Sequence, residues 1–425
     1  METTKYFRIE TLGCKVNQYD SQLIREQLLK NGYKECSGND VPAGDGSLIV
    51  INTCTVTGKT DQKCRNTIRK MIKQKGSAKV VVTGCYVDGD RVAIEDIDGV
   101  DYIAENEYKT NILKYINKDK EYDGVSGITR FEGRTRAFLK IQDGCNEFCT
   151  YCKVPYVRGK VESKDVSAVV REAQAIINNG YKEIVLTGIH LGSYGAESDK
   201  NCSLIEVLKA LSDIEGDFRI RLSSIEPMNI TPSLIEQLST IQKLCPHFHI
   251  PIQSGDDKIL QKMGRHYTYS EYKEIIDCFK KYFPQCAIST DLIIGFPGET
   301  MEHFDHSVKA IGENLFSKVH VFPFSARKGT KACDYPDRVS PEEMQSREFI
   351  LDFITNDTAF MFRRTQLGLV KQVLFEEECE EGVYSGFTEN YQRVKVKGTS
   401  ELLNTFASVK LTDYDVDCFY GELQQ

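Results

Sequence analysis

The sequence predicts an α/β chain of three parts: an N-terminal open parallel α/β domain, a central partial (βα)6 barrel of the TIM type and a small C-terminal all-β barrel. Strand-like and helix-like stretches alternate over residues 1–120, and six further strand–helix units follow between residues 135 and 364. Beyond Gly368 only short strand-like stretches remain, separated by polar turns. Alternation of this kind favours parallel sheets covered by helices, whereas successive short strands favour a closed barrel.

The length and composition support this division. A chain of 425 residues is expected to form two or three domains. We place them at residues 1–120, 135–364 and 365–425, with the glycine-containing stretch 121–134 as a linker. No apolar stretch approaches the ~20 residues of a membrane span, and the N-terminus lacks the apolar core of a signal peptide. We therefore expect a cytoplasmic protein without membrane contact, in which fifteen cysteines are not a disulfide framework.

Three cysteines occupy equivalent places in the N-terminal domain. The strands expected at residues 6–10, 48–51 and 79–83 are each followed by a cysteine, namely Cys14, Cys54 and Cys85. The carboxyl ends of parallel strands meet at one edge of a sheet, where ligands bind. One such cysteine alone is more often a buried core residue. Three at matching strand ends predict a [4Fe–4S] cluster held by three thiolates.

Three more cysteines lie on one short loop. Residues 144–152 read GCNEFCTYC, so Cys145, Cys149 and Cys152 have the spacing C-x₃-C-x₂-C. Three thiolates bind three irons of a [4Fe–4S] cube and leave the fourth iron open to a small molecule. The alternative is a zinc site that takes a ligand from elsewhere in the chain, although zinc patterns more often contain paired C-x₂-C knuckles.

The central domain carries polar and glycine-rich segments at the ends of its expected strands. Six strands are expected near residues 138–141, 183–186, 219–223, 248–252, 288–294 and 319–322, with helices near 166–179, 204–212, 233–241, 269–282 and 302–314. Cys145 follows the first strand, and segments such as TGIHLGSYG (187–195) and PIQSG (251–255) follow later ones. The active site of a TIM-type barrel lies at the carboxyl ends of its strands, so the cysteine loop belongs to that end.

These motifs together resemble the radical S-adenosylmethionine (SAM) methylthiotransferases over nearly the whole chain. The cysteine loop has the spacing of the radical SAM cluster loop, with an aromatic residue, Tyr151, before its last cysteine. The segments TLGCKVN (11–17), NTCTVT (52–57) and VTGC (82–85) resemble the N-terminal domain of that family. Together with RLSSIEP (221–227), they are most similar to the enzymes that modify N6-threonylcarbamoyladenosine, 3′ of the anticodon. The isopentenyladenosine and ribosomal-protein enzymes tend instead to have Gln-Met-Asn or Pro-Lys-Asn after the first cysteine.

The resemblance implies two [4Fe–4S] clusters, one on each cysteine set, with SAM at the open iron of the cluster held by Cys145, Cys149 and Cys152. It implies no catalytic side chain beyond the cluster ligands. The wider radical SAM family implies contact with SAM by a group of candidates, which are Tyr151, Thr187, Gly188, Gln253, Ser254 and Arg265. A plain interpretation as a helix cap or turn residue also applies to Thr187, Gly188, Gln253, Ser254 and Arg265.

The C-terminal segment is similar to the small TRAM barrel that ends these enzymes and binds tRNA. A strand expected at residues 391–397 would place Tyr391, Arg393, Lys395 and Lys397 on one face, which suits base stacking and phosphate contact. The net charge of −8 and the acidic character of this segment argue against RNA binding, so a solvated edge strand guarded by cations is the alternative. A second basic stretch, in the helix expected at residues 57–75, is either a solvated face or a phosphate-contacting surface.

The sequence therefore predicts a tRNA methylthiotransferase that acts on C2 of N6-threonylcarbamoyladenosine. Its expected partners are the anticodon stem-loop and a low-potential electron donor such as flavodoxin or ferredoxin. Two alternatives stay open: a methylthiotransferase that acts on isopentenyladenosine or on a ribosomal protein, and a non-catalytic iron–sulfur protein that binds RNA.

Overall fold

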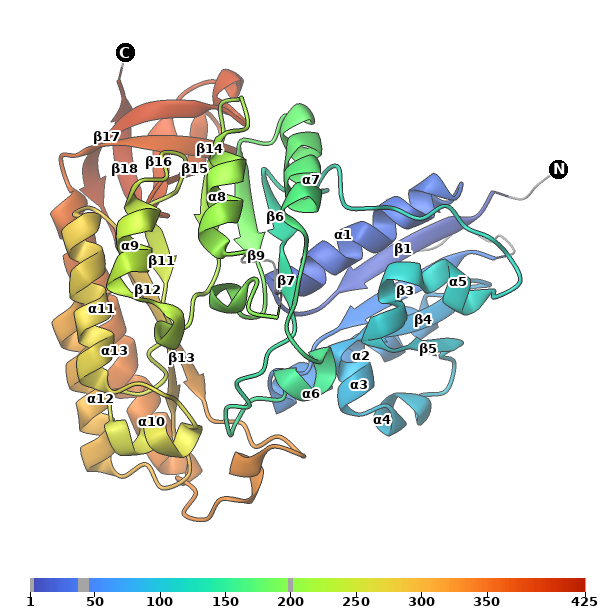
Figure 1. Cartoon of the computed structure of the whole chain (residues 1–425), viewed down its shortest axis with the longest axis horizontal. Helices are drawn as coiled ribbons and strands as arrows, with labels where there is room; N and C mark the ends of the chain where they lie inside the picture. The colour runs from blue at the N-terminus through green and yellow to red at the C-terminus, as the bar shows by residue number, and fades with distance from the viewer. Residues whose placement is uncertain (1–3, 37–45, 198–201, 425) are drawn as a thin grey trace.

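The computed structural model describes residues 4–36, 46–197 and 202–424 and contains the three expected parts in chain order (Figure 1). The fold class is confirmed: parallel sheets with helices are followed by a closed C-terminal barrel.

The N-terminal part is a parallel sheet in the order β2-β1-β3-β4-β5. Its strand β3 (Leu48–Thr53) is buried along its whole length and faces two apolar clusters, because its side chains alternate between the faces of the sheet. Helix α1 (Lys15–Lys30) packs into one cluster and α2 (Gly58–Lys73) into the other. The remaining elements are β1 (Tyr6–Thr11), β2 (Lys34–Glu35), β4 (Lys79–Gly84), α3 (Cys85–Gly89), α4 (Val92–Glu95), β5 (Tyr102–Ala104) and α5 (Ile112–Ile116).

The stretch expected as a linker is packed against the central part. Ile128 and Phe131 are buried, and the Phe131 N–H donates to the Tyr181 hydroxyl at 2.6 Å. The Ile128 N–H donates to the Glu172 carboxylate at 2.8 Å. These contacts attach the stretch to the first helix of the barrel.

Six parallel strands form the wall of the partial barrel, in two sheets of three. One sheet contains β6 (Arg136–Lys140), β9 (Glu183–Thr187) and β10 (Arg219–Leu222), and the other contains β11 (His247–His249), β12 (Ala287–Ile294) and β13 (Lys318–Pro323). Isolated parallel bridges, Ile220 with Leu244 and Ser224 with His249, join the two sheets. One large apolar core connects these strands to the helices outside them, which are α7 (Val166–Asn178), α8 (Leu204–Ser212), α9 (Pro232–Ser239), α10 (Asp257–Met263), α11 (Tyr269–Tyr282) and α12 (Met301–Asn314).

A long helix that the sequence did not predict, α13 (Pro341–Gln366), runs along α12 and β13 (Figure 1). Its start has ordinary signals, since the Ser340 hydroxyl accepts the Glu343 N–H at 3.2 Å and proline follows. The hydrophobic periodicity of this segment does not indicate its buried face, because Arg347 and Arg363 are buried while Phe349 is 81% exposed. None of the helices described here is both long and apolar enough to cross a membrane.

The C-terminal part is a closed barrel in the order β14-β15-β16-β18-β17. Its strands are β14 (Val370–Glu380), β15 (Val383–Thr388), β16 (Arg393–Lys397), β17 (Phe406–Tyr414) and β18 (Phe419–Leu423). The strand expected to begin at Tyr391 begins at Arg393, so placing Tyr391 on the same strand face as the cations is wrong. Tyr391 has a left-handed backbone (φ 65°), and its ring stacks on Phe387 and lies 4.7 Å from the Arg221 guanidinium.

The C-terminal barrel docks on the amino-terminal ends of the central strands, opposite the cysteine loop. Arg219 and Arg221 donate to the carbonyl oxygens of Phe387 and Glu389, both at 2.9 Å. Glu183 binds both arginines at 2.6 and 2.7 Å. Burial alone would raise the pKa of Glu183, but Arg221 and Arg219 outweigh it and hold that pKa well below the ordinary 4.5.

Replacing Glu183 by Gln should lower the free energy of unfolding by about 3–5 kcal/mol, because two buried guanidinium groups lose their counter-charge. The depressed pKa of Glu183 means that its stabilisation is present above about pH 4.5 and is lost as the pH falls. Urea unfolding followed by circular dichroism at several pH values measures both effects. Asp217→Asn is the matched control, because it breaks an ion pair with Lys182 in which the Asp217 side chain is 72% exposed. That control should cost less than about 1 kcal/mol, and an equal effect of the two substitutions would contradict the prediction.

Candidate functional site

The level ends of three neighbouring strands bring Cys14, Cys54 and Cys85 together. Thr11 of β1 pairs with Asn52 of β3, and Asn52 with Thr83 of β4, so the three following loops share one edge. All three cysteines line one cavity of about 240 Å³, together with Cys152 of the second set. Gly13 (φ 111°) permits this approach, since a Cβ there would lie 2.6 Å from the Cys54 Cβ.

Asn17, which the sequence did not single out, holds these loops in place. Its Nδ2 donates to the carbonyl oxygens of Leu12 and Thr53, both at 2.8 Å, and its own carbonyl accepts from the Asn52 side chain at 2.8 Å. The sequence signal for this role was a polar residue in the first turn of the helix after Cys14. The signal was not sufficient, because the partners Asn52 and Thr53 lie on β3.

The second cysteine set lies on the loop between β7 (Gln142–Asp143) and α6 (Val154–Arg158), beyond the carboxyl end of β6. The Gln142 side chain donates to the carbonyl oxygens of Asp143 and Gly144 at 2.7 and 2.8 Å, and the Thr150 N–H donates to the Met263 carbonyl at 2.9 Å. The loop is thus fixed at both ends by the barrel. A short strand, β8 (Glu162–Ser163), pairs with β7 and closes the segment.

Burial favours the protonated form of three of the thiols, Cys54, Cys145 and Cys152. Desolvation raises the pKa of Cys54 and Cys152 to about 12 and that of Cys145 to about 11. The thiolate is the form that binds metal, so cluster binding must release protons.

The spacing of the sulfurs bears on the zinc alternative. Within the described ranges, no three cysteine sulfurs lie mutually within 4.8 Å, the spread that would suit a single ion. A [4Fe–4S] cube is larger and is held by thiolates set further apart. Each set offers three thiols, the number that holds a [4Fe–4S] cluster and leaves one iron open.

Arg158 connects the two cysteine sets. Its Nε donates to the Cys85 sulfur at 3.1 Å, and its Nη1 donates to both oxygens of Asp143 at 2.9 Å, immediately before the second loop. Its Nη2 donates to the Asn17 side chain. The pKa of Asp143 is lowered, because Lys140 and Arg158 outweigh the effect of its burial.

Three of the residues expected to contact SAM lie beside the cysteines. Tyr151 and Gln253 line the cavity, and Gln253 has a left-handed backbone (φ 62°). Arg265 donates to the Cys149 sulfur at 3.3 Å and forms an ion pair with Glu226. A SAM-binding role for these three residues stays a prediction.

The other three candidates, Thr187, Gly188 and Ser254, do not line this cavity, and their contact with SAM stays a prediction. The Thr187 carbonyl accepts the Ile141 N–H at 2.9 Å, and a Cβ on Gly188 would lie 2.7 Å from the Gln142 side chain. The Ser254 hydroxyl accepts the Asp256 N–H at 3.2 Å and is 3.4 Å from the Ser307 hydroxyl, away from the cavity lining. This placement favours the turn interpretation for Ser254.

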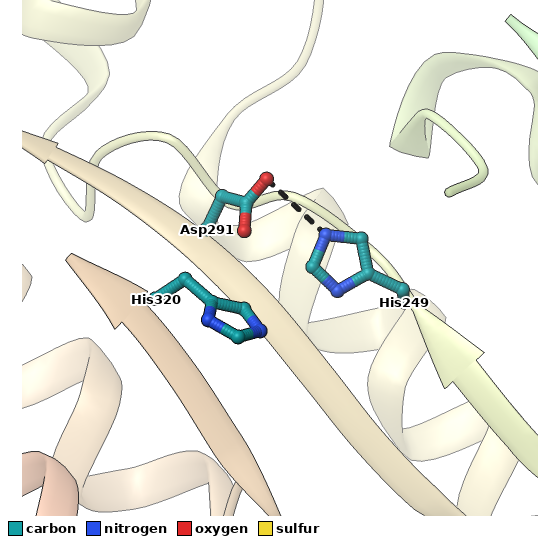
Figure 2. Close-up of side chains that lie close together, drawn as sticks. All are labelled: His249, Asp291 and His320. Atoms are coloured by element: carbon teal, nitrogen blue, oxygen red, sulfur yellow. Dashed lines mark ion pairs between the residues drawn. The ribbon is translucent and has the colours of Figure 1, made fainter. Parts of the chain in front are cut away.

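Two further features were not predicted as site residues. His190 places its Nδ1 3.9 Å from the Cys145 sulfur and 2.9 Å from the Ser193 hydroxyl. On the barrel wall, His249, Asp291 and His320 form a compact polar cluster (Figure 2). His190 lies in the strand-end segment 187–195, whereas His249, Asp291 and His320 lie within three different expected strands, and no spacing rule connects them.

Two family models match the chain. The radical SAM superfamily matches residues 139–311, and a family described as uncharacterized protein family UPF0004 matches residues 6–105. These ranges contain the second and the first cysteine set, respectively.

Named relatives cover almost the whole chain. The threonylcarbamoyladenosine tRNA methylthiotransferase MtaB of Bacillus subtilis is 38% identical over 94% of this chain and 92% of that protein. MtaB of Thermotoga maritima is 34% identical, over 96% and 94%. The tRNA-2-methylthio-N(6)-dimethylallyladenosine synthase of Clostridium tetani is 33% identical, over 96% and 93%.

A solved structure shares the fold. The radical SAM methyltransferase TsrM from Kitasatospora setae, solved with cobalamin and a [4Fe-4S] cluster, matches with a TM-score of 0.57 at 12% identity. The match covers 78% of this chain and 77% of that chain, and at this identity it shows the fold alone.

Replacing Cys14, Cys54 and Cys85 together by Ala should remove about half of the bound iron, and so should the triple replacement of Cys145, Cys149 and Cys152, because each set is expected to hold its own cluster. Iron analysis and Mössbauer spectra of the anaerobically reconstituted protein measure this. Cys278→Ala, on α11, is the control and should keep all the iron. Complete loss of iron from either triple variant would contradict two independent sites.

Proposed function

This chain belongs to the radical SAM tRNA methylthiotransferase family, and from that premise we propose that it adds a methylthio group to C2 of N6-threonylcarbamoyladenosine next to the anticodon, using two [4Fe–4S] clusters. One observation carries the two-cluster proposal: cysteines of both sets line a single cavity. Reacting atoms must come within about 3–3.5 Å of one another, so radical generation and sulfur delivery need a shared cavity.

The chain supplies position and shielding for this chemistry. When bound, the clusters and SAM supply a 5′-deoxyadenosyl radical and the sulfur that is transferred. Cys145, Cys149 and Cys152 would hold the cluster that binds SAM, and Cys14, Cys54 and Cys85 would hold the auxiliary cluster. Tyr151 and Gln253 border the space between them, and a site closed to water protects a reactive intermediate.

The threonylcarbamoyl substrate is favoured over dimethylallyladenosine by the relatives and by the segment around the first cysteine. The MtaB proteins named above are 34–38% identical to this chain, and the Clostridium tetani dimethylallyl enzyme 33%. A tRNA substrate places the activity in the cytoplasm. A low-potential donor such as flavodoxin or ferredoxin would supply the electron.

Two basic surfaces would contact the tRNA backbone. Helix α2 starts at the cavity, where Thr57 lines it and caps the helix, and exposes a row of cations, namely Lys59, Lys63, Arg69, Lys70 and Lys73. Strand β16 carries Arg393, Lys395 and Lys397, of which the first two already form ion pairs with Glu377 and Glu380. Because the C-terminal barrel docks at the far end of the strands, β16 would contact tRNA away from the adenine.

Deleting the gene should remove 2-methylthio-N6-threonylcarbamoyladenosine from tRNA, and restoring it should bring the nucleoside back. Mass spectrometry of digested tRNA measures this. Loss of the methylthio group from dimethylallyladenosine or from a ribosomal protein instead would favour the sister activities.

Cys14→Ala, Cys54→Ala and Cys85→Ala should each form 5′-deoxyadenosine but no methylthiolated tRNA, because only the auxiliary cluster is lost. Cys149→Ala should form neither product. Anaerobic turnover with reductant and SAM, followed by mass spectrometry, separates the two outcomes. Methylthiolation by a Cys54→Ala variant would exclude an auxiliary cluster from the reaction.

The triple replacements Lys59/Lys63/Lys70→Ala and Arg393/Lys395/Lys397→Ala should each flatten the salt dependence of tRNA binding, by about one unit of log–log slope for each lost phosphate contact. Binding isotherms at several salt concentrations measure the slope. The matched control is Lys273/Lys281/Lys309→Ala, on the outer helices α11 and α12, which should leave it unchanged. If the Arg393/Lys395/Lys397→Ala variant also kept the salt dependence of the unmodified protein, β16 would be a solvated edge strand.

A further inference from the structure

A polar cluster on the inner barrel wall reaches the cavity that contains the cysteines. His249 ends β11, Asp291 lies in β12 and His320 lies in β13, and the three side chains point toward one another (Figure 2). Asp291 and His320 are register partners on adjacent strands, and ligand atoms of the three residues lie within 4.8 Å of one another. Asp291 also lines the cavity, so the cluster belongs to its wall.

A chain of hydrogen bonds fixes one side of this cluster. His249 Nε2 is 3.2 Å from Asp291 Oδ2, and His249 Nδ1 is 2.9 Å from the Ser289 hydroxyl, which lies 3.3 Å from His247 Nε2. A neutral histidine that donates from Nε2 to the Asp291 carboxylate accepts at Nδ1 from the Ser289 hydroxyl. Within the described chain, the His320 side chain has a ring contact with His249 but no hydrogen bond. His320 and the second Asp291 oxygen therefore keep hydrogen-bonding capacity for a ligand.

Charged groups of both signs act on His320. Desolvation lowers the pKa of His320, Asp291 opposes the shift, and His249, Lys318 and Lys15 lower the pKa further.

We propose that His249, Asp291 and His320 form the subsite that binds the polar N6 substituent of the adenine, the threonylcarbamoyl group. This inference rests on the proposed function and deepens it. The group carries a carboxylate, a hydroxyl and ureido N–H groups, whereas a dimethylallyl group carries no polar atom. Asp291 accepts from a ureido N–H or the hydroxyl, and His320 donates to the carboxylate.

The same contacts provide selectivity against an apolar substituent. A dimethylallyl group in this place would cover Asp291 and His320 without offering a hydrogen bond, and burying unpaired polar groups costs about 1–3 kcal/mol each. A site built to hydrogen-bond its substrate discriminates far more strongly than an apolar pocket does.

A divalent cation is the competing occupant, since imidazole and carboxylate are ordinary metal ligands. The hydrogen bond between His249 Nε2 and Asp291 already occupies one ligand atom of each residue, so a cation would have to replace it.

The test compares two synthetic anticodon stem-loops, one with threonylcarbamoyladenosine and one with dimethylallyladenosine, competing for the reconstituted holoenzyme. Asp291→Asn and His320→Leu should each lower the preference for the threonylcarbamoyl stem-loop over the dimethylallyl one. The ratio of the two affinities and the ratio of the two methylthiolation rates should each fall by about 10–100-fold, the value of one charge-assisted hydrogen bond. His320→Gln retains a donor and an acceptor and should keep most of the ratio. His306→Ala, an exposed histidine on α12, is the control and should leave it unchanged.

The ratio distinguishes lost recognition from structural damage, because a structural defect lowers the affinity and the rate for both substrates equally. An unchanged ratio in Asp291→Asn and His320→Leu would overturn the inference alone, leaving the proposed function intact. A different outcome would assign the cluster to a metal: the oxidised holoenzyme binds Mn²⁺ stoichiometrically, Asp291→Asn abolishes that binding, and the ratio stays unchanged. A wild-type protein that prefers the dimethylallyl stem-loop would overturn both proposals.

Discussion

A buried network of charges around Arg158 holds the two cysteine sets in one cavity. Arg158 comes from α6 beside the second set, and its partners are Asp143 in front of that loop, Asn17 on α1 and the Cys85 sulfur. Asp20 on α1 binds Lys109 and Lys140, each at 2.5 Å. Burial alone would raise the pKa of Asp20, but Lys109, Lys140 and Arg158 lower it to about 2. Breaking a buried ion pair leaves an uncompensated charge, which costs several kcal/mol of free energy. Separation of the N-terminal sheet from the barrel is therefore strongly unfavourable.

That constraint determines what the cavity can do. The N-terminal sheet contributes Cys14, Cys54 and Cys85 at its carboxyl edge, and the barrel contributes the second loop, Gln253 and Asp291 at its own. Neither part encloses the space alone. Because the charges that join the two parts are next to the cysteines, the distance between the proposed clusters is tied to the same contacts that hold the domains together. A substrate adenine between them would meet the polar wall of β11, β12 and β13.

The C-terminal barrel lies at the opposite end of the strands, where Glu183 binds Arg219 and Arg221 and both arginines bind backbone carbonyls of the barrel. Tyr391 belongs to this interface, although its sequence position suggested an exposed RNA contact. Its ring lies between Phe387, Arg136 and Arg221. Helix α2, whose capping residue Thr57 lines the cavity, carries cations that we propose to contact the tRNA backbone.

The sequence by itself determined the fold class, most strands and helices of the two α/β parts, and the six cysteines as candidate ligands, because these depend on local periodicity, on C-x₃-C-x₂-C spacing and on the rule that parallel strands end at one edge. It misjudged α13, whose buried face contains Arg347 and Arg363, and Tyr391, whose backbone leaves the strand conformation. Only the tertiary structure decided the roles of Asn17, Arg158 and the cluster of His249, Asp291 and His320. Their partners lie tens of residues away in the chain, 141 in the case of Arg158 and Asn17. No local sequence pattern encodes such pairs, since these contacts form only when the chain has folded and distant strands and helices have come together.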